Sequence, residues 1–504
     1  MLAASAAVLT VACAMASRER CPIDAAHPSA HAGLWFAWGW WVAGVLCAVI
    51  AAVQYFAPAW SAVFLDAGLL AYSTAPGRAV GNMRQPNHLA TALVCAMVWT
   101  AWLRHIRRLS AAACGASIVA TVFAVSLSAS RTGALSLGML LLWALVDRRL
   151  PRSARWLLAL TPLIYLACWL GLAEWAAWAQ TQYYGADRLQ SGSDPSSSRF
   201  AIWKNAITLL AQHPWTGVGW GHFNFAWTFT PFPDRPTAFF DHTHNLPLQL
   251  AVEIGLPATV LVLGLFAWSM WQARGAWSGD RADPNREQSP ARAALVMLVV
   301  LGVHSLLEYP LWYAYFLLPA AWALGLFIGS APVPAGAKPM SATAQRWTAR
   351  LLALAGVAMI AGALYALWDH RRIERIFEAN AGDAPLAERI ADGRRSKLFG
   401  HHADYAAVTN EPKDMNLASF RRPLLQLVDT RLLIAYIEAL KATGEDRKAL
   451  YAAQRLREFQ RADAQAYFRD CDSPTPPFQC ERAPVTGLTW RDMIPPAATN
   501  DSGR

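Results

Sequence analysis

Five short polar motifs lie beside apolar stretches of the sequence, and each contains residue types that can carry chemistry. Arginine binds phosphate through two parallel hydrogen bonds, and histidine exchanges a proton near neutral pH. Each motif alone has an ordinary explanation, since an interfacial arginine commonly snorkels to headgroups and a loop histidine commonly caps a helix. Five together indicate one site. The motifs are GNMRQPNHLA from Gly81, SASRTGAL from Ser128, SSSRFAIWKNA from Ser196, DHTHNLPLQLAVEIGLP from Asp241 and HSLLEYPLWYAYFLLP from His304.

The composition says what kind of protein must position these motifs. The chain has 504 residues, of which 55% are hydrophobic and 15% charged, so it is not a set of soluble domains. Its net charge of +10 comes from short basic clusters between apolar runs, a pattern that orients membrane proteins and does not suggest nucleic-acid binding. The 24 tryptophans agree with a membrane protein, because indoles gather at membrane interfaces.

Apolar runs long enough to approach a membrane span predict an all-α polytopic membrane protein with about ten transmembrane helices. The first run is either a weak span or the remnant of a longer amino terminus. The runs are 1–17, 34–56, 87–103, 109–127, 132–147, 156–177, 246–272, 293–307, 311–329 and 350–368.

Arginine-rich connections predict the orientation of these spans, because basic loops remain in the cytoplasm. The opposite, extracytoplasmic face then receives the long loop 178–245, the turns at Arg131 and Glu308, and the tail after residue 369. The predicted cytoplasmic connections contain Arg104, Arg107 and Arg108; Arg148, Arg149, Arg152 and Arg155; Arg274, Arg281, Arg286 and Arg292; and Lys338, Arg346 and Arg350.

The polar tail carries an independent signal for the same face. Cys471 and Cys480 close a proline-rich loop, which predicts a disulfide and an oxidising compartment. Apolar residues at helical spacing on both sides of Gly444 predict a helical hairpin. We therefore expect a transmembrane domain at 1–369 that includes the loop 178–245, a periplasmic helical domain at 370–483, and a disordered tail at 484–504.

The order of the five motifs between about Ala79 and Gly329 resembles that of the O-antigen ligase superfamily of bacterial inner-membrane glycosyltransferases. Among these, the likeness is greatest to the protein O-oligosaccharyltransferases that glycosylate pilin. The resemblance implies transfer of a preassembled glycan from a polyprenyl diphosphate carrier to an acceptor hydroxyl, on the periplasmic side of the inner membrane. The expected partners are the carrier-linked oligosaccharide, a pilin-like acceptor protein and the lipid bilayer.

The same resemblance implies roles for individual residues. His244 matches an essential loop histidine of the family and would accept the acceptor's proton, while Arg131 and Arg199 would bind the diphosphate as it leaves. The other motif residues are expected to contact the glycan or carrier, or to orient His244. They are Arg84, Gln85, Asn87, His242, Asn245, Glu308 and Tyr309.

No metal cofactor is expected. Two histidines at positions i and i+2, as in His242 and His244, are poor zinc spacing, and no Asp-x-Asp occurs in these motifs to hold Mg²⁺. Several activities stay open at this point. Lipid A core as the acceptor would make the chain an O-antigen ligase, and a glycan repeat would make it a polymerase. Outside enzymes, a secondary transporter would use polar residues at the bilayer midplane, whereas these lie at span ends.

Overall fold

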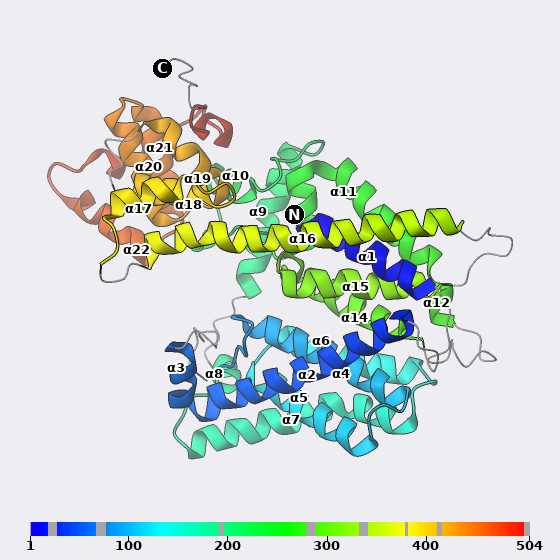
Figure 1. Ribbon diagram of the computed structural model, residues 1–504. Coiled ribbons are helices and arrows are strands. Elements are labelled where there is room, and N and C mark those ends of the chain that lie inside the picture. Colours follow the sequence, from blue (N-terminus) through cyan, green and yellow to red (C-terminus); the bar gives the residue numbers. More distant parts are fainter. Residues whose placement is uncertain are drawn as a thin grey trace. The chain divides into compact units, whose positions relative to one another are not determined.

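A computed structural model describes residues 2–18, 28–66, 77–190, 196–278, 289–331, 341–378, 382–410 and 416–497 of the chain. The described residues form helices and connecting turns, without a β-strand (Figure 1). The chain divides into two compact units. Unit 1 contains Met1–Asp194 and Leu265–Ala355, and unit 2 contains Pro195–Gly264 and Gly356–Arg504.

Each of the ten predicted apolar runs is a helix, which confirms the all-helical class. Four helices are long and apolar enough to cross a membrane, so the protein is a multi-pass membrane protein, while ten spans stay a prediction. The helices that correspond to the runs are α1 (Leu2–Arg18), α2 (Pro28–Phe56), α4 (Pro86–His105), α5 (Ala111–Leu127), α6 (Arg131–Val146), α7 (Arg152–Trp178), α11 (Leu246–Gln272), α14 (Ala291–Ser305), α15 (Ala314–Gly329) and α16 (Ala342–Phe377).

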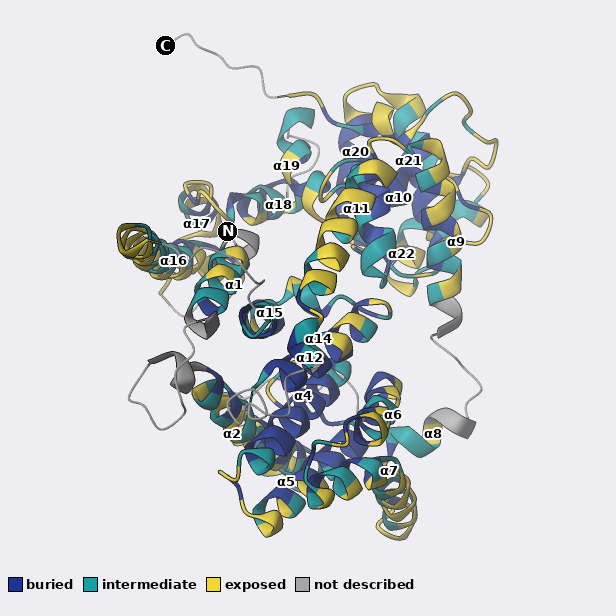
Figure 2. Cartoon of the chain, turned by 90° about the vertical axis from the view of Figure 1, so that its right-hand side faces the viewer, coloured by how far each residue is buried: buried dark blue, intermediate teal, exposed yellow. Residues whose placement is uncertain are grey.

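Unit 1 packs around α4, whose residues from His88 to Leu103 are all buried. The helices α2, α5, α6 and α14 contact it, and α4 appears dark blue among them in Figure 2. Small residues permit the closest approaches, as at Gly133 of α6, where a Cβ would come within 2.7 Å of Ala90 of α4. Because α4 is central, polar residues at its amino-terminal end can meet those of several neighbouring helices. The remaining short helices of unit 1 are α3 (Pro58–Asp66), α8 (Tyr184–Gln190), α12 (Gly275–Ser278) and η1 (Pro310–Trp312).

Unit 2 has a single core built from the long loop and the tail together. The short helix α10 (Phe223–Phe229) lies in the loop and packs on α19 (Arg421–Gln426), α21 (Asp446–Glu458) and η6 (Trp490–Met493) of the tail. Buried side chains from both segments, such as Trp227 and Leu456, belong to one apolar cluster. The structure therefore divides the chain differently from the predicted boundary at residue 369, because the loop and the tail bury their apolar faces against each other.

The predicted helical hairpin is confirmed. It consists of α20 (Thr430–Ala442) and α21, separated by Gly444 at φ 81°. Cys471 and Cys480, which follow it, are joined by a disulfide with a Cα–Cα distance of 5.2 Å. The other elements of unit 2 are α9 (Ser196–Gln212), α17 (Leu386–Gly393), α18 (Gly400–Asn410), η3 (Leu417–Phe420), α22 (Ala462–Gln465), η4 (Ala466–Asp472) and η5 (Phe478–Cys480).

The expected disorder after Pro484 is wrong for residues 484–497, while 498–504 lie outside the described residues. Trp490 and Met493 are buried in the core of unit 2. The Tyr436 hydroxyl donates to the Met493 carbonyl at 2.9 Å, and the Trp490 indole donates to His213 Nε2 at 3.2 Å. Apolar burial and two specific hydrogen bonds offset the entropy of ordering this polar, proline-containing segment.

The bond between Trp490 and His213 makes the docking of this segment depend on pH. Burial and the charge of Arg491 hold the pKa of His213 below its ordinary value of 6.5. Protonation is therefore harder in the folded protein, so the contact is at full strength above about pH 6.5 and weakens as the pH falls below it. We expect amide protection of residues 484–497, corrected for intrinsic exchange, to decrease on acidification. A His213→Phe variant, which still offers Trp490 an aromatic ring, should lose this pH dependence; an unchanged dependence would contradict the assignment.

Candidate functional site

In unit 1, three of the five motifs meet at the amino-terminal end of α4. The Asn87 side chain accepts a hydrogen bond from Ser130 Oγ at 2.7 Å and donates one to Glu308 Oε1 at 3.2 Å. Ser130 is also the N-cap of α6 and accepts from the Gly133 amide. Asn87 thus joins the start of α4, the start of α6 and the turn after α14, and we call Asn87, Ser130 and Glu308 the Asn87 cluster.

Aromatic and imidazole rings surround this cluster. His88 is buried, and its Nδ1 lies 2.8 Å from the Tyr315 hydroxyl. Its ring packs edge-on against Tyr313 at 4.6 Å and Tyr309 at 6.4 Å. One turn further along α4, Thr91 Oγ1 lies 2.9 Å from Nδ1 of the buried His304. These contacts hold the turn that carries Glu308 and Tyr309 against α4.

The residues of unit 1 that were predicted to belong to the site have different surroundings in the structure. Gln85 is the N-cap of α4 and accepts from the His88 amide, so its side chain has a task within the fold. Arg84 and Arg131 are both exposed. Arg84 has a φ of 57°, an uncommon value for a residue with a Cβ, and Ala129, just before the N-cap of α6, has a φ of 48°. Such backbone strain gathers at functional sites, which is consistent with a role for both turns.

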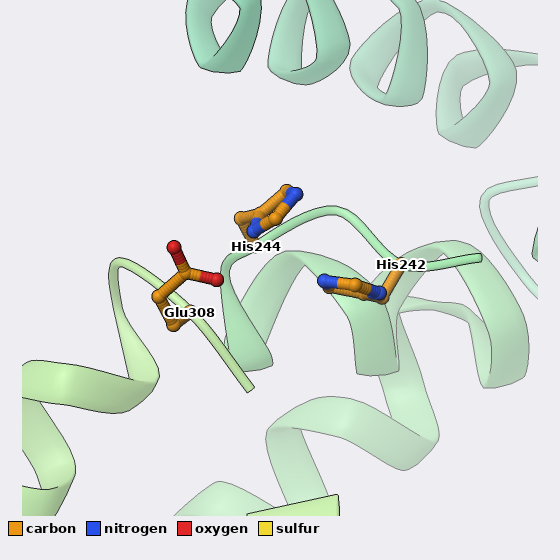
Figure 3. Close-up of side chains that lie close together, drawn as sticks. All are labelled: His242, His244 and Glu308. Carbon is orange, nitrogen blue, oxygen red and sulfur yellow. The ribbon is translucent and has the colours of Figure 1, made fainter. Parts of the chain in front are cut away.

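In unit 2, the DHTHN motif from Asp241 to Asn245 forms a tight loop before α11, which we call the histidine loop (Figure 3). Asp241 hydrogen bonds to Nδ1 of His242, whose side chain is only 7% exposed. The His242 ring lies 4.2 Å from that of His244, centroid to centroid. His244 is half-buried and has a φ of 56°, so the loop holds this histidine in a strained conformation.

Backbone and capping contacts fix this loop. Asn245 accepts from the Leu248 amide at 3.0 Å, so it caps α11. The Thr243 amide donates to Gln249 Oε1 at 2.7 Å, and the Thr243 carbonyl accepts from the Trp203 indole at 2.9 Å. The hydrogen bonds of Thr243 and Asn245 therefore hold this loop in a defined conformation.

The carboxyl group of Asp241 lies beside His242, and the hydrogen bond between the two residues affects the pKa of this carboxyl group. Burial alone would raise the pKa of Asp241, but the hydrogen bond and charge of His242 outweigh it and leave the pKa below its ordinary value. Asp241 is thus a carboxylate at neutral pH. It fixes the Nδ1 side of the His242 ring, in the manner of a carboxylate that orients an imidazole.

Arg199 lies near the start of α9, one turn before Trp203, and is half-buried. Residues four apart share a face of a helix. Because Trp203 binds the Thr243 carbonyl, Arg199 lies on the face of α9 that is turned toward the histidine loop.

Residues of the tail of unit 2 contact the segment that leads into the histidine loop. Phe239 stacks on Phe459, which directly follows α21, at 4.0 Å between centroids, and Phe240 lies 5.6 Å from the His244 ring. Asn224 connects the same segments, donating to the Phe240 carbonyl at 2.9 Å and accepting from the Val428 amide at 2.7 Å.

Several residues that build the Asn87 cluster and the histidine loop were not predicted from the sequence. Ser130 and Gln249 act through hydrogen bonds that periodicity does not reveal. Asp241 was not expected to orient His242, although its place directly before that histidine was a usable signal. Glu308 is drawn in Figure 3 at the turn after α14; in unit 1 its carboxylate accepts from Asn87.

We expect Asn87→Ala to destabilise unit 1 by about 1–3 kcal/mol, because the buried Glu308 carboxylate loses a donor and Ser130 loses an acceptor. Asn87→Asp keeps the acceptor for Ser130 but sets a second carboxylate against Glu308, so it should be at least as harmful. Thermal unfolding of the purified protein in detergent measures both, with exposed Asn82→Ala of the same motif as the control. If both Asn87 variants unfold like the unaltered protein, the cluster does not hold these helices together.

The fold and these residues define a class: a multi-pass helical membrane protein in which arginine, histidine and carboxylate side chains gather at helix ends. Comparison with known families is more specific. The O-antigen ligase model matches residues 116–263, the carboxy-terminal model of a virulence factor membrane-bound polymerase matches residues 292–469, and the protein glycosylation ligase model matches residues 79–103. Together these ranges contain all five motifs. These matches show that the chain is similar to proteins of the O-antigen ligase superfamily and to protein O-oligosaccharyltransferases.

Two curated proteins of Acinetobacter baylyi are similar to the chain. A general O-oligosaccharyltransferase is 26% identical over 290 residues, which cover 55% of this chain and 49% of that protein. A ComP-specific O-oligosaccharyltransferase is 27% identical over 258 residues, which cover 49% of this chain and 44% of that protein. The chain therefore spans about half the length of the curated relatives it matches.

Proposed function

We propose that the chain transfers a preassembled oligosaccharide from a polyprenyl diphosphate carrier to a serine or threonine hydroxyl of an acceptor protein such as pilin. The observation that carries the proposal is the histidine loop, in which Asp241, His242 and His244 are held in a defined and strained arrangement within the range matched by the O-antigen ligase model. The similarity to two O-oligosaccharyltransferases supports a protein acceptor.

The proposed reaction breaks the bond between the anomeric carbon and the phosphate oxygen and forms one from that carbon to the acceptor oxygen. The electron pair leaves with the polyprenyl diphosphate, and the hydroxyl proton passes to His244. A weak alcohol nucleophile benefits from such a base, and the departing diphosphate benefits from fixed cations. Arg199 and Arg131 are assigned this second role, and Arg84 a weaker contact to the carrier.

The remaining residues act on geometry in this proposal. His242, held by Asp241, orients His244, while Asn245 caps α11 and fixes the end of the loop. Asn87, Glu308 and Tyr309 hold the turns of unit 1 and offer polar groups to the sugar. Cationic side chains take the place of a metal, so the reaction is proposed to be metal-independent. The proposed location is the periplasmic side of the inner membrane, in agreement with a disulfide-bonded tail.

A second acceptor class deserves a direct test, because the matched models are named for an O-antigen ligase and a membrane-bound polymerase. Purified chain, lipid-linked glycan and either pilin, lipid A core or a second glycan repeat form the necessary assay. Transfer to pilin supports the proposal, whereas transfer confined to lipid A core or to glycan would assign the ligase or polymerase reaction instead.

We expect Arg131→Lys and Arg199→Lys each to reduce transfer although the charge is kept, because an ammonium group cannot reproduce the bidentate hydrogen bonds of guanidinium to phosphate. Loss of one charge-assisted bond, about 1.5–3 kcal/mol, corresponds to about a tenfold to a hundredfold lower rate. Initial transfer rates in membranes at matched expression measure the effect, with exposed Arg346→Lys as the control. Full activity in both variants would indicate that these arginines only anchor the protein at the interface.

A further inference from the structure

The GVGWG segment, Gly217 to Gly221, is fixed to the middle of α11. The Val218 and Gly219 amides donate to the carbonyls of Val252 and Glu253 at 2.9 Å. On the other side, the Leu256 amide donates to the Pro214 carbonyl at 2.8 Å. This loop therefore lies along α11 between residues 252 and 256.

Glycine makes this close approach possible. A Cβ on Gly217 would lie 2.4 Å from the Glu253 carbonyl oxygen, and one on Gly255 would lie 2.3 Å from the Trp215 carbonyl oxygen. Both glycines have positive φ, 65° and 80°, and α11 kinks at Gly255, two residues before Pro257. The loop and the kink are therefore one feature of the fold.

The two parts of α11 differ in character on either side of this kink. Before it, the polar residues Gln249 and Glu253 are buried within the protein. After it, the exposed residues are large and apolar: Leu256, Val260, Leu261, Val262, Leu265, Phe266 and Trp268. The part of α11 from Leu256 to Gln272 is about 26 Å long, close to the hydrocarbon thickness of about 30 Å, whereas all of α11 from Leu246 is about 41 Å long.

This difference in exposure and length places the edge of the hydrocarbon layer near Gly255. The GVGWG segment, which is bonded to α11 there, lies at the same level. That loop exposes two large aromatic side chains, Trp215 at 76% and Trp220 at 66%. Indole is favoured at the membrane interface, where its ring is partly out of water and its N–H can bond to headgroups or water. Two exposed tryptophans at this level would be costly in water and favourable in the interface.

We propose that the segment from His213 to His222 is an interfacial membrane anchor whose partner is the phospholipid headgroup region, entered by Trp215 and Trp220. The part of α11 before Gly255, together with the histidine loop before it, then lies outside the hydrocarbon layer. The anchor fixes the height of that loop relative to the bilayer surface. This inference rests on the chain being a membrane protein and not on the proposed reaction.

Photo-crosslinking tests the anchor in the full chain. Benzoylphenylalanine is incorporated at position 215 or 220, and irradiation in membranes that contain a clickable phosphatidylethanolamine reveals lipid adducts. Position 260, on the lipid-facing part of α11, is the positive control, and the exposed position 442 of α20 is the negative control. We expect adducts at 215, 220 and 260 and none above background at 442. Lipid adducts at 260 but not at 215 or 220 would overturn the proposal.

A second measurement uses the unaltered protein and so does not depend on the folding of a variant. Hydroxyl-radical labelling in nanodiscs, read by mass spectrometry, should leave Trp215 and Trp220 protected despite their exposure within the protein. Leu427, which is 50% exposed on the tail, should be oxidised under the same conditions. Oxidation of both tryptophans to the extent expected of water-exposed indoles would contradict the anchor.

Discussion

Replacing His244 by alanine is expected to reduce glycan transfer by about a hundredfold to ten-thousandfold, the usual contribution of a positioned general base. The loop before α11 should survive the change, because Thr243 and Asn245 make hydrogen bonds that hold it in place. Alanine also accepts the φ of 56° less readily than glycine, so His244→Gly serves as a parallel variant that removes the imidazole without that strain.

Two comparisons make this result interpretable. Asp241→Asn weakens the partner of His242 while leaving His244 in place. Its transfer rate should therefore fall less than that of His244→Ala. His402→Ala removes an exposed histidine of α18 in the same unit, to which no role is assigned, and its rate should equal that of the unaltered protein. Initial rates in membranes at matched expression decide the matter. If His244→Ala and His244→Gly both transfer glycan at the unaltered rate, His244 is a structural residue.

The second large effect concerns Arg235, which joins the long loop to the tail of unit 2. Its side chain is 1% exposed, and its Nε lies 3.0 Å from Glu458 of α21. The guanidinium also donates to the Trp227 carbonyl at 2.8 Å and to the Thr230 carbonyl. Burial lowers the pKa of Arg235 to about 10, so it remains charged at neutral pH.

Aromatic rings enclose this guanidinium. The rings of Trp227, Phe232 and Phe459 lie 4.6–5.1 Å from its central carbon. Arg235→Ala would leave two backbone carbonyls without their donor and a cavity between the rings. Each buried polar group that loses its partner costs about 1–3 kcal/mol. We therefore expect the free energy of unfolding of unit 2 to fall by about 3–5 kcal/mol. Phe459 also supports Phe239, so transfer activity should fall with it.

Arg455 offers a matched control for Arg235. It binds the same carboxylate, with Nη2 2.7 Å from Glu458 Oε1, but its Nε has no hydrogen-bond partner among the described residues. Arg455→Met should therefore cost less than Arg235→Ala, and Arg235→Lys should be intermediate because an ammonium cannot reach all three acceptors. Pulse proteolysis in detergent measures the unfolding of each variant. Equal stability of Arg235→Ala and the unaltered protein would show that the loop and tail do not depend on this residue.

The helices of this protein could be predicted because their signals are local. The apolar runs are long, and capping residues stand where helices begin, such as Ser130 before α6 and Asn245 before α11. The hairpin was equally readable from helical spacing on both sides of Gly444. The polar motifs of unit 1 were expected on one face, and the Asn87 cluster brings three of them into contact.

Long-range partners could not be predicted. Arg235 lies in a proline-containing loop, and Glu458 follows it 223 residues later, so no spacing connects them. Helical periodicity shows that a helix has an apolar face but not which partner covers it, and for that reason the shared core of the loop and the tail was missed. The end of the tail had one overlooked signal, the capping box formed by Thr489 and Asp492 at the start of η6.

Glycan transfer to a protein hydroxyl is tested most directly by the intact mass of the acceptor. The chain is co-expressed with a lipid-linked glycan pathway and a candidate pilin in a host without its own ligase, beside His244→Ala at the same level. We expect pilin to gain the mass of the whole glycan, attached to serine or threonine, and the variant to abolish this gain. Unmodified pilin together with glycan on lipid A core would contradict it.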